Sequence, residues 1–497
     1  MTKFIPSQYQ AAVYQHITDT NRNCVIDAVA GSGKSTTIVN ALSLIPQDKQ
    51  VLFLAFNKAI VEELKVKVGS LNHVEIKTLH SLGMSAIRKT YRCFVNDSKY
   101  GKYINTSVKY GTIKPDNELN TKELREYRTN LIKLTNLSRN YLADSELDVQ
   151  DIAYKHDLQI IDNEPSIILK IMDWGKENVK TIDFTDMVWL PNVLNLRVEH
   201  FDFVFIDECQ DLNTAQRELF LRTIKPVTGR FVAVGDPRQA IYGFTGADVE
   251  SFNTLKSLPN TDLLPLSVCY RCDSEIINLA KDIVPQIQAR DNAPQGIIDH
   301  EAQTADIQDN DMVLCRITAP LVTLCMQYIA QGTKAFVKGR DIGLNLINML
   351  KNTDRVVLRE AIDVIHSELS TLSNKIAKRQ GVSTLQAQED PQYQAFRDRL
   401  QAIENLSYGL TTVFEAVNRI ELIFKDNDKQ GICLSTIHRA KGLEADRVFI
   451  LRPDKLYLKH CMKVAWMAEQ ERNLVYVAYT RAKHYLGFIS DFSDNNE

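Results

Sequence analysis

Short apolar runs alternate along this chain with segments in which apolar residues recur every three or four positions. Runs of the first kind lie at residues 25–30, 51–56, 74–80, 201–206 and 231–235. Continuous apolar runs of this length are typical of strands that are buried on both faces of a parallel sheet. Strands that alternate with helical patterns predict an α/β fold, in which ligands collect at the carboxyl ends of the strands.

The first apolar run leads into a glycine-rich turn, VIDAVAGSGKS at residues 25–35, and a helix is expected over 36–44. The glycines would let backbone N–H groups approach phosphate oxygens at the positive end of that helix. Lys34 would reach the β and γ phosphates, and the Ser35 hydroxyl would bind Mg²⁺. Because Ala28 stands where the phosphate-loop pattern has its first glycine, an ordinary turn before a helix is the alternative.

The run at 201–206 delivers two adjacent carboxylates, Asp207 and Glu208. In a phosphate-loop ATPase, the first acid would hold Mg²⁺ through water, and the second would orient and deprotonate the attacking water. Paired acids at the end of a strand can also cap a helix. Together with the loop upstream, however, they predict nucleotide hydrolysis.

Residues from about 88 to 181 break the alternation, since they are polar, rich in Tyr and Asn and mostly helical in pattern. Within residues 99–139, nine Lys and Arg face four Asp and Glu, and four tyrosines are interleaved with them. Cations for phosphates and rings for bases suit a single nucleic-acid strand. A solvated helical face explains the same pattern equally well.

The composition excludes some classes of protein but does not indicate the activity. The 497 residues predict three or four domains, and 44% hydrophobic and 24% charged residues are ordinary for a globular protein. A net charge of −3 argues against coating nucleic acid through overall charge. No apolar run is long enough to span a membrane and the amino terminus does not resemble a signal peptide, so we expect a cytoplasmic or nuclear protein.

The nine cysteines are scattered, and one close pair, Cys269 and Cys272, has no second pair to complete a zinc site. We expect reduced thiols.

Residues 231–247, FVAVGDPRQAIYGFTGA, resemble motif III of the UvrD/Rep-type superfamily 1 helicases, and DECQD at 207–211 resembles their motif II. Further motifs follow in family order: IV at 266–272 (LSVCYRC), V at 434–444 (LSTIHRAKGLE) and VI at 471–482 (ERNLVYVAYTRA). Residues 53–59 and 78–81 resemble the family's two early DNA-contact motifs. Alanine in place of the first glycine of the phosphate-loop pattern is usual in this family, so Ala28 agrees with the resemblance.

The resemblance implies two RecA-like parallel-sheet domains that clamp ATP and Mg²⁺. By similarity, Gln10 reads adenine, Tyr270 stacks on it, and Glu444 touches the ribose or the DNA-coupling loop. The implied ATP-binding residues are Gln10, Ala30, Gly31, Ser32, Gly33, Lys34, Ser35, Thr36, Tyr270, Arg271, Glu444 and Arg481.

The resemblance also implies the chemistry at the phosphates. Ser35 and Asp207 would hold the metal, Gln239 would sense the γ-phosphate, and Arg271 and Arg481 would reach it from the second RecA-like domain. The implied catalytic residues are Lys34, Asp207, Glu208, Gln239, Arg271 and Arg481.

Contacts to the DNA strand are implied for residues on loops above both sheets: Phe56, Asn57, Thr78, His80, Phe244, Thr436 and His438. Phe244 stands where the family usually has a base-stacking Trp. Thr245 replaces the family's usual Arg, so Arg238 or Arg439 is a candidate for the missing cation.

By resemblance, the chain is organised as two α/β domains, each with a helical insertion. About 160 residues separate motifs IV and V, fewer than large members of the family carry, and no helix-hairpin-helix signature follows. The expected domains are a first RecA-like domain at 1–88 and 181–265, an accessory helical insertion at 89–180, a second RecA-like domain at 266–349 and 430–497, and a reduced helical insertion at 350–429.

The favoured function is an ATP-dependent DNA helicase that moves 3′ to 5′ on single strands and acts at junctions with duplex, in replication, repair or recombination. The polarity rests on resemblance alone. A translocase that strips proteins or recombination filaments from DNA, and a nucleotide-gated DNA-binding protein, are the alternatives, and RNA is a weaker option as substrate. We expect a monomer, and the compact chain suggests a phage or another mobile element as one source.

Overall fold

The computed structural model describes residues 5–55, 58–69, 71–156, 158, 160, 163–241, 250–425, 430–458 and 465–492. The chain divides into two compact units. The first comprises Met1–Val29 and Gly33–Ser267, and the second comprises Ala30–Ser32 and Val268–Glu497. Each unit contains its own parallel sheet, which confirms the α/β fold expected from the apolar runs.

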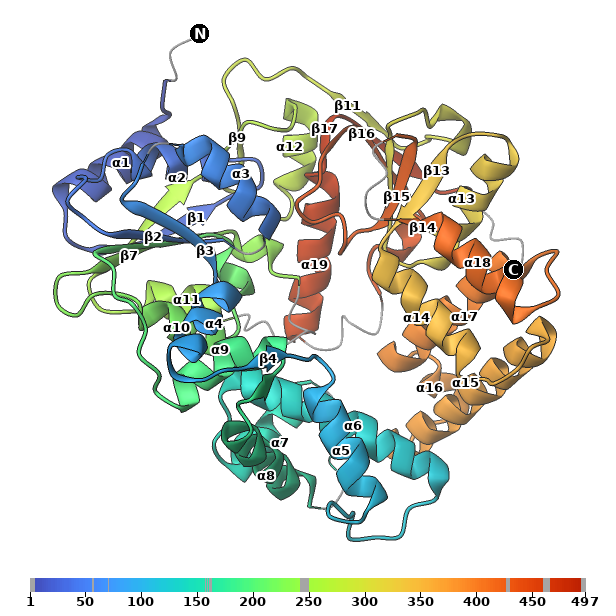
Figure 1. Cartoon of the computed structure of the whole chain (residues 1–497). Coiled ribbons are helices and arrows are strands. Elements are labelled where there is room, and N and C mark those ends of the chain that lie inside the picture. The colour runs from blue at the N-terminus through green and yellow to red at the C-terminus, as the bar shows by residue number, and fades with distance from the viewer. Residues whose placement is uncertain are drawn as a thin grey trace. The chain divides into compact units, whose positions relative to one another are not determined.

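The first unit is built on a six-stranded sheet in the order β3-β2-β6-β7-β1-β8, and neighbouring strands run parallel (Figure 1). Every residue of β2, β6 and β7 is buried because helices cover both faces. The strands are β1 (Asn23–Ala28), β2 (Val51–Ala55), β3 (Val74–Thr78), β6 (Phe203–Ile206), β7 (Arg230–Gly235) and β8 (Thr261–Leu266).

Helices join these strands, and several begin at side-chain caps that the sequence encodes locally. The Ser7 hydroxyl accepts from the Gln10 N–H at the start of α1, and the Thr78 hydroxyl accepts from the Ser81 N–H at the start of α4. The helices are α1 (Gln8–Asp19), α2 (Lys34–Leu42), α3 (Lys58–Val68), α4 (Leu79–Thr90), α9 (Phe184–Val193), α10 (Thr214–Leu221) and α11 (Ser251–Lys256), with short 3₁₀ turns η1 (Cys209–Asp211) and η2 (Pro237–Gln239).

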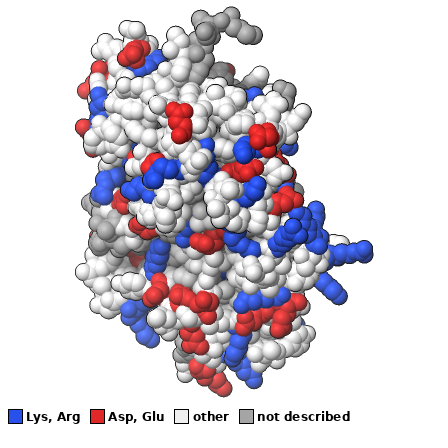
Figure 2. Space-filling view, turned by 90° about the vertical axis from the view of Figure 1, so that its left-hand side faces the viewer, with Lys and Arg blue, Asp and Glu red and all other residues white. Residues whose placement is uncertain are grey.

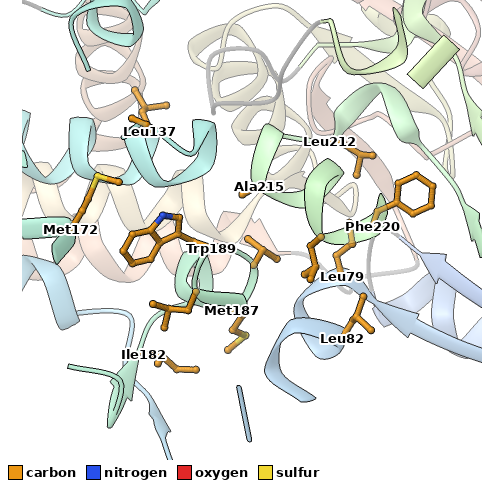
Figure 3. Packing of buried hydrophobic residues seen from close by; sticks show 14 of the residues in the cluster. Leu79, Leu82, Leu137, Met172, Ile182, Met187, Trp189, Leu212, Ala215 and Phe220 are labelled. Atoms are coloured by element: carbon orange, nitrogen blue, oxygen red, sulfur yellow. The ribbon is translucent and has the colours of Figure 1, made fainter. Parts of the chain in front are cut away.

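Four helices form the segment that breaks the strand-helix alternation, as its pattern predicts: α5 (Lys99–Lys109), α6 (Thr121–Tyr141), α7 (Glu146–Lys155) and α8 (Glu164–Glu177). Short strands β4 (Phe94–Val95) and β5 (Thr181–Ile182) pair at its base. One hydrophobic cluster runs from these helices to the sheet, and Figure 3 shows Trp189 of α9 beside Leu137 of α6 and Met172 of α8. The helical segment therefore shares a core with the first unit.

Part of the basic and aromatic stretch at 99–139 is packed inside this segment, whereas other cations of the stretch, such as Lys102 and Lys133, are exposed. Lys99, Tyr100, Tyr127 and Arg139 are buried, and Tyr103 stacks on Trp174 with ring centroids 3.7 Å apart. Tyr110 is the one tyrosine of the four that is exposed, at 73%. The interleaved rings were a candidate binding face for a single strand, and for these buried side chains both that hypothesis and the solvated-face alternative are wrong.

The reason is a buried ionic cluster between α5, α6 and α9. The Arg139 guanidinium donates to Asp183 and Asp186 at 2.8 Å, and Lys99 Nζ lies 2.7 Å from Asp186. The Tyr100 hydroxyl donates to Asp186 at 2.7 Å. Each charge is compensated inside the fold, so the cations have a structural role.

The second unit is built on a seven-stranded sheet in the order β11-β17-β16-β12-β15-β13-β14, again with parallel neighbours. Its strands are β11 (Ile297–Asp299), β12 (Met312–Cys315), β13 (Ala335–Lys338), β14 (Phe424–Lys425), β15 (Ile432–Thr436), β16 (Ala445–Leu451) and β17 (Ala482–Ile489). A separate two-stranded pair joins β9 (Val268–Cys269) to β10 (Gln288–Ala289).

The helices of the second unit are α12 (Ser274–Ala280), α13 (Ala319–Ala330), α14 (Arg340–Lys351), α15 (Leu358–Gln380), α16 (Thr384–Ala387), α17 (Pro391–Ser407), α18 (Val413–Ile423) and α19 (Ala465–Tyr479). Helices α15 to α18 occupy the segment that the polar, Gln-rich pattern predicts to be helical. They share one hydrophobic cluster with β12, β15 and β16. Both helical segments thus belong to the units into which they are inserted, and the finer four-domain division stays a prediction.

Among the described helices, none has the length and apolar character that crossing a membrane requires.

Candidate functional site

The carboxyl edge of the first sheet collects several residues that the sequence singles out. The glycine-rich loop follows β1, Asp207 follows β6 and Asp236 follows β7. Because β7 lies between β6 and β1 and all three run parallel, these three strand ends share one edge. This is where ligands of open parallel sheets bind.

The glycine-rich loop has the backbone that the sequence predicts. Gly31 and Gly33 have φ values of 65° and 77°, in the left-handed region that favours glycine. Helix α2 begins at Lys34, directly after Gly33, so the loop places backbone N–H groups at a helix amino end. Such an end is suited to bind an anion. Ser35 is half-buried and Thr36 is exposed.

Lys34 is paired with one of the two adjacent acids. Its Nζ lies 3.0 Å from Glu208 Oε1, and Gln210 Nε2 donates to Glu208 Oε2 at 2.6 Å. Burial by itself would lower the pKa of Lys34, but the carboxylates of Glu208, Asp207 and Asp236 outweigh it and raise that pKa. Lys34 is therefore fully charged at neutral pH, as a phosphate ligand must be.

Asp207 and Ser35 fit a magnesium ion by the chemistry of their donors. Asp207 is buried at the end of β6, and its Oδ1 accepts from the Glu208 N–H at 2.9 Å. Carboxylate and hydroxyl oxygens are the hard donors that Mg²⁺ prefers, usually one or two per site beside phosphate and water oxygens. In keeping with so small a donor set, the described residues contain no group of three or more His, Cys, Asp and Glu that could hold a metal.

A network that the sequence motifs did not reveal surrounds Gln239. Its Nε2 donates at 2.7 Å to Asp236, which is fully buried. The Arg238 guanidinium forms ion pairs with Asp236 at 3.0 Å and with Asp27 at 2.6 Å. Burial raises the pKa of Asp236, although Arg238 and Lys34 oppose that rise. Asp27 interrupts an otherwise apolar run. This interruption is the feature of the sequence from which the network could have been predicted.

Gln10 is a buried residue. Its Oε1 accepts from the Ser7 N–H at 3.0 Å and its Nε2 donates to Thr37 Oγ1 at 3.1 Å. The amide is thereby held against the first turns of α2, the helix that begins at the glycine-rich loop.

In the second unit, three residues of motifs IV, V and VI come together. Arg271 Nε lies 2.7 Å from Glu444 Oε2, and Arg271 Nη1 donates to the Thr480 carbonyl at 3.1 Å. Burial would raise the pKa of Glu444, but Arg271 and Lys483 lower it. Arg481 is buried, and its guanidinium donates to the carbonyls of Val477 and Leu443 at 2.9 Å each.

Tyr270 precedes Arg271 and keeps 40% of its surface exposed. An exposed ring can stack on a base, as the resemblance implies for this position.

The expected DNA contacts lie at strand ends of both units. Thr78 ends β3 and caps α4, and His80 packs edge-on against Phe184 with ring centroids 6.2 Å apart. Burial lowers the pKa of His80. Thr436 ends β15. Phe184 is 54% exposed, so it is a further aromatic candidate that the motif comparison did not assign.

His438 follows β15 within motif V. Burial, with a smaller effect of Arg316, lowers its pKa to about 3. The imidazole is therefore neutral at physiological pH. Phe56, Asn57, Phe244 and Thr245 lie outside the described residues.

The surface does not carry a single sign of charge. On the face shown in Figure 2, Lys and Arg are interleaved with Asp and Glu. This matches the small net charge of −3 and suits local contacts with nucleic acid better than binding through overall charge.

Comparison with known proteins identifies two matching families. The UvrD/REP helicase N-terminal domain matches residues 8–260, and the UvrD-like helicase C-terminal domain matches residues 159–493.

Individual relatives are distant. The ATP-dependent DNA helicase Rep of Escherichia coli is 25% identical over 302 residues, which cover 56% of this chain and 43% of Rep. The probable DNA helicase II homolog of Mycoplasma genitalium is 23% identical over 95% of this chain and 83% of its own length. The F-box DNA helicase protein 1 of Schizosaccharomyces pombe is 22% identical over 93% of this chain and 55% of its own.

The chain spans about half the length of most of these curated relatives. The two family matches nevertheless run from near its beginning to near its end, in the order of motifs that the sequence contains. The chain therefore belongs to the UvrD/Rep helicase family.

Proposed function

We propose that this protein is an ATP-dependent DNA helicase that moves 3′ to 5′ along single-stranded DNA and separates duplex ahead of it. The observation that carries the proposal is the 3.0 Å ion pair between Lys34 and Glu208. It joins the phosphate loop to the acids after β6, so the two halves of an ATP-hydrolysing site meet at one sheet edge. Membership of the helicase family supports DNA as the substrate.

At the phosphates, Lys34 would exchange Glu208 for the β and γ phosphate oxygens of ATP, which releases the carboxylate for chemistry. Glu208 would then accept a proton from the attacking water, while Gln210 keeps its other oxygen in place at 2.6 Å. Ser35 and Asp207 would hold Mg²⁺, which neutralises charge on the phosphates when bound. Gln239 would report the state of the γ-phosphate through its bond to Asp236.

In the second unit, Arg271 and Arg481 would supply guanidinium groups to the charge that develops on the transferring phosphoryl group. Glu444 and the Thr480 carbonyl orient Arg271. Arg481 would have to leave the carbonyls of Val477 and Leu443 to reach a phosphate. That exchange offers a physical route from nucleotide binding to movement of the unit.

At the other end of the nucleotide, Gln10 would read adenine and Tyr270 would stack on it. The DNA strand would contact Thr78, His80, Thr436 and His438, together with Phe56, Asn57 and Phe244. Neutral His438 would pack against bases or sugars and would add no cation to the phosphate contacts.

The decisive experiment is ATP-driven separation of a short duplex that carries either a 3′ or a 5′ single-stranded tail. We expect separation with the 3′ tail and at least a hundredfold loss in the Lys34→Ala variant. Lys65→Ala is the matched control, because Lys65 on α3 pairs with Glu62 at the surface, 3.1 Å away. Separation from the 5′ tail alone would contradict the polarity.

DNA-stimulated phosphate release without strand separation on either substrate would favour the translocase instead.

A further inference from the structure

Two buried thiols flank the residues proposed to contact nucleotide in the second unit. Cys269 ends β9, Cys272 follows three positions later, and both are reduced and fully buried. The Cys272 N–H donates to Cys269 Sγ at 3.5 Å. A Cys-X-X-Cys turn that brings the two sulfurs together is the geometry of a dithiol that can close to a disulfide.

The turn is also tied to the position of Arg271. The Thr480 carbonyl accepts from Arg271 Nη1 at 3.1 Å and from the Cys272 thiol at 3.8 Å. On the backbone side, Arg290 Nη1 donates to the carbonyls of Tyr270 and Cys272 at 3.0 and 3.3 Å. A movement of Cys272 Sγ away from Thr480 therefore disturbs the anchor that orients Arg271.

The two sulfurs differ in their readiness to react. Hydrogen bonding from Cys272 and the positive charge of Arg271 lower the pKa of Cys269, against the effect of burial. The neighbouring Cys269 sulfur and burial raise the pKa of Cys272. Cys269 therefore loses its proton more readily than Cys272. One sulfur can attack and the other can resolve.

We propose that Cys269 and Cys272 form a reversible disulfide on exposure to a peroxide and that this disulfide switches off the ATP-hydrolysing site. The Cys269 thiolate attacks one oxygen of hydrogen peroxide, the O–O bond breaks, and with one proton water leaves and a sulfenic acid remains. Cys272 Sγ then attacks the sulfenic sulfur, its proton joins the departing hydroxyl as a second water, and the S–S bond forms. Two thiols are oxidised and one peroxide is reduced to two waters.

The switch acts through Arg271 and rests on the function proposed above. Closing the S–S bond draws Cys272 Sγ from the Thr480 carbonyl and twists the turn that carries Tyr270 and Arg271. We expect DNA-stimulated ATP hydrolysis to fall at least tenfold on oxidation and to return when dithiothreitol reduces the bond. Disulfides that form in reducing compartments are usually transient and catalytic or redox-sensing.

The test treats the full chain with hydrogen peroxide and follows two readouts, mass spectrometry of the linked peptide and DNA-stimulated phosphate release. Cys272→Ser keeps a donor to Thr480, so we expect it to hydrolyse ATP normally and to resist the oxidant. Cys269→Ser should also resist inactivation by the oxidant. It provides a second test if one of the two variants folds poorly. Cys433→Ser is the matched control, since its half-buried thiol lies elsewhere in the second unit and its loss should leave oxidation sensitivity unchanged.

The two proposals fail in different ways. Reduced protein without DNA-stimulated hydrolysis contradicts the proposed function, whether or not the disulfide forms. Active protein in which peroxide leaves Cys269 and Cys272 unlinked overturns the switch. A linked protein that keeps its hydrolysis rate, or a Cys272→Ser variant that loses activity to peroxide as the wild type does, overturns it too.

Discussion

His438 shows how burial sets the chemistry of a single side chain. Its pKa of about 3 in the folded chain lies well below the value of about 6.5 that is usual for an exposed histidine. Burial is the larger cause and the Arg316 guanidinium the smaller one. A histidine in a motif of a nucleic-acid-binding family invites the assumption of a positive charge, and the structure argues against it here.

This shift predicts a pH dependence of stability. Well above pH 6.5 His438 is neutral in both the folded and the unfolded chain, so its contribution to the free energy of unfolding is complete. As the pH falls below about 6.5, His438 becomes protonated in the unfolded chain but stays neutral in the folded chain down to about pH 3. The free energy of unfolding therefore decreases. From pH 7 to pH 5, urea unfolding should show about 2 kcal/mol more loss in wild type than in His438→Gln. Equal losses in the two proteins would contradict the burial of the imidazole.

At the scale of elements, the approach of α4 to α9 depends on one residue without a side chain. A Cβ at Gly83 would lie 1.8 Å from the Met187 carbonyl oxygen on α9. The two helices pack backbone against backbone at this point, in the core of the first unit that includes Met187 and Trp189. Thr78 caps helix α4, so the position of the helix sets one of the proposed DNA contacts.

Gly83→Ala should therefore lower the free energy of unfolding by about 3 kcal/mol, in the upper range for overpacking, because backbone must move. Gly101→Ala is the matched control, since it also lies in a helix but its Cβ would meet only Ile132 Cδ1 at 3.8 Å. There we expect a gain of up to about 1 kcal/mol from helix propensity. Denaturant unfolding of both variants measures the contrast, and a Gly83→Ala protein as stable as the control would refute the close approach.

At the scale of the whole molecule, each helical insertion shares a hydrophobic cluster with the sheet of its own unit. One hydrophobic cluster joins α5 to α8 to the first sheet, and another joins α15 to α18 to the second. A segment that shares its core with a sheet cannot lose its packing without exposing apolar surface on both. The cooperative unfolding unit is then the compact unit, with its insertion included.

Hydrogen exchange at increasing denaturant tests this expectation. Amides of α6 should lose protection together with those of β2, and amides of α17 together with those of β15. Loss of protection in α6 at clearly lower denaturant, while β2 stays protected, would show that the helical segment is an independent domain.

The sequence alone determined the fold class, the glycine-rich loop before Lys34 and the paired acids after a strand. These features depend on neighbouring residues: an apolar run, two glycines before Lys34, and Asp207 and Glu208 directly after a strand. The order of family motifs extended that local information to a family, which the comparisons confirm. Alternation of strands and helices also located both helical segments, since a change of period is visible along the chain.

Only the tertiary structure decided which polar residues face inward. Arg139 and Lys99 look like free cations in the sequence, yet their partners Asp183 and Asp186 lie 44 to 87 positions away, on another helix. Gln10 turns its amide to Thr37, and Arg238 reaches Asp27 on a different strand. No local pattern records such pairs, because they form when distant segments fold together and compensate the cost of burying charge.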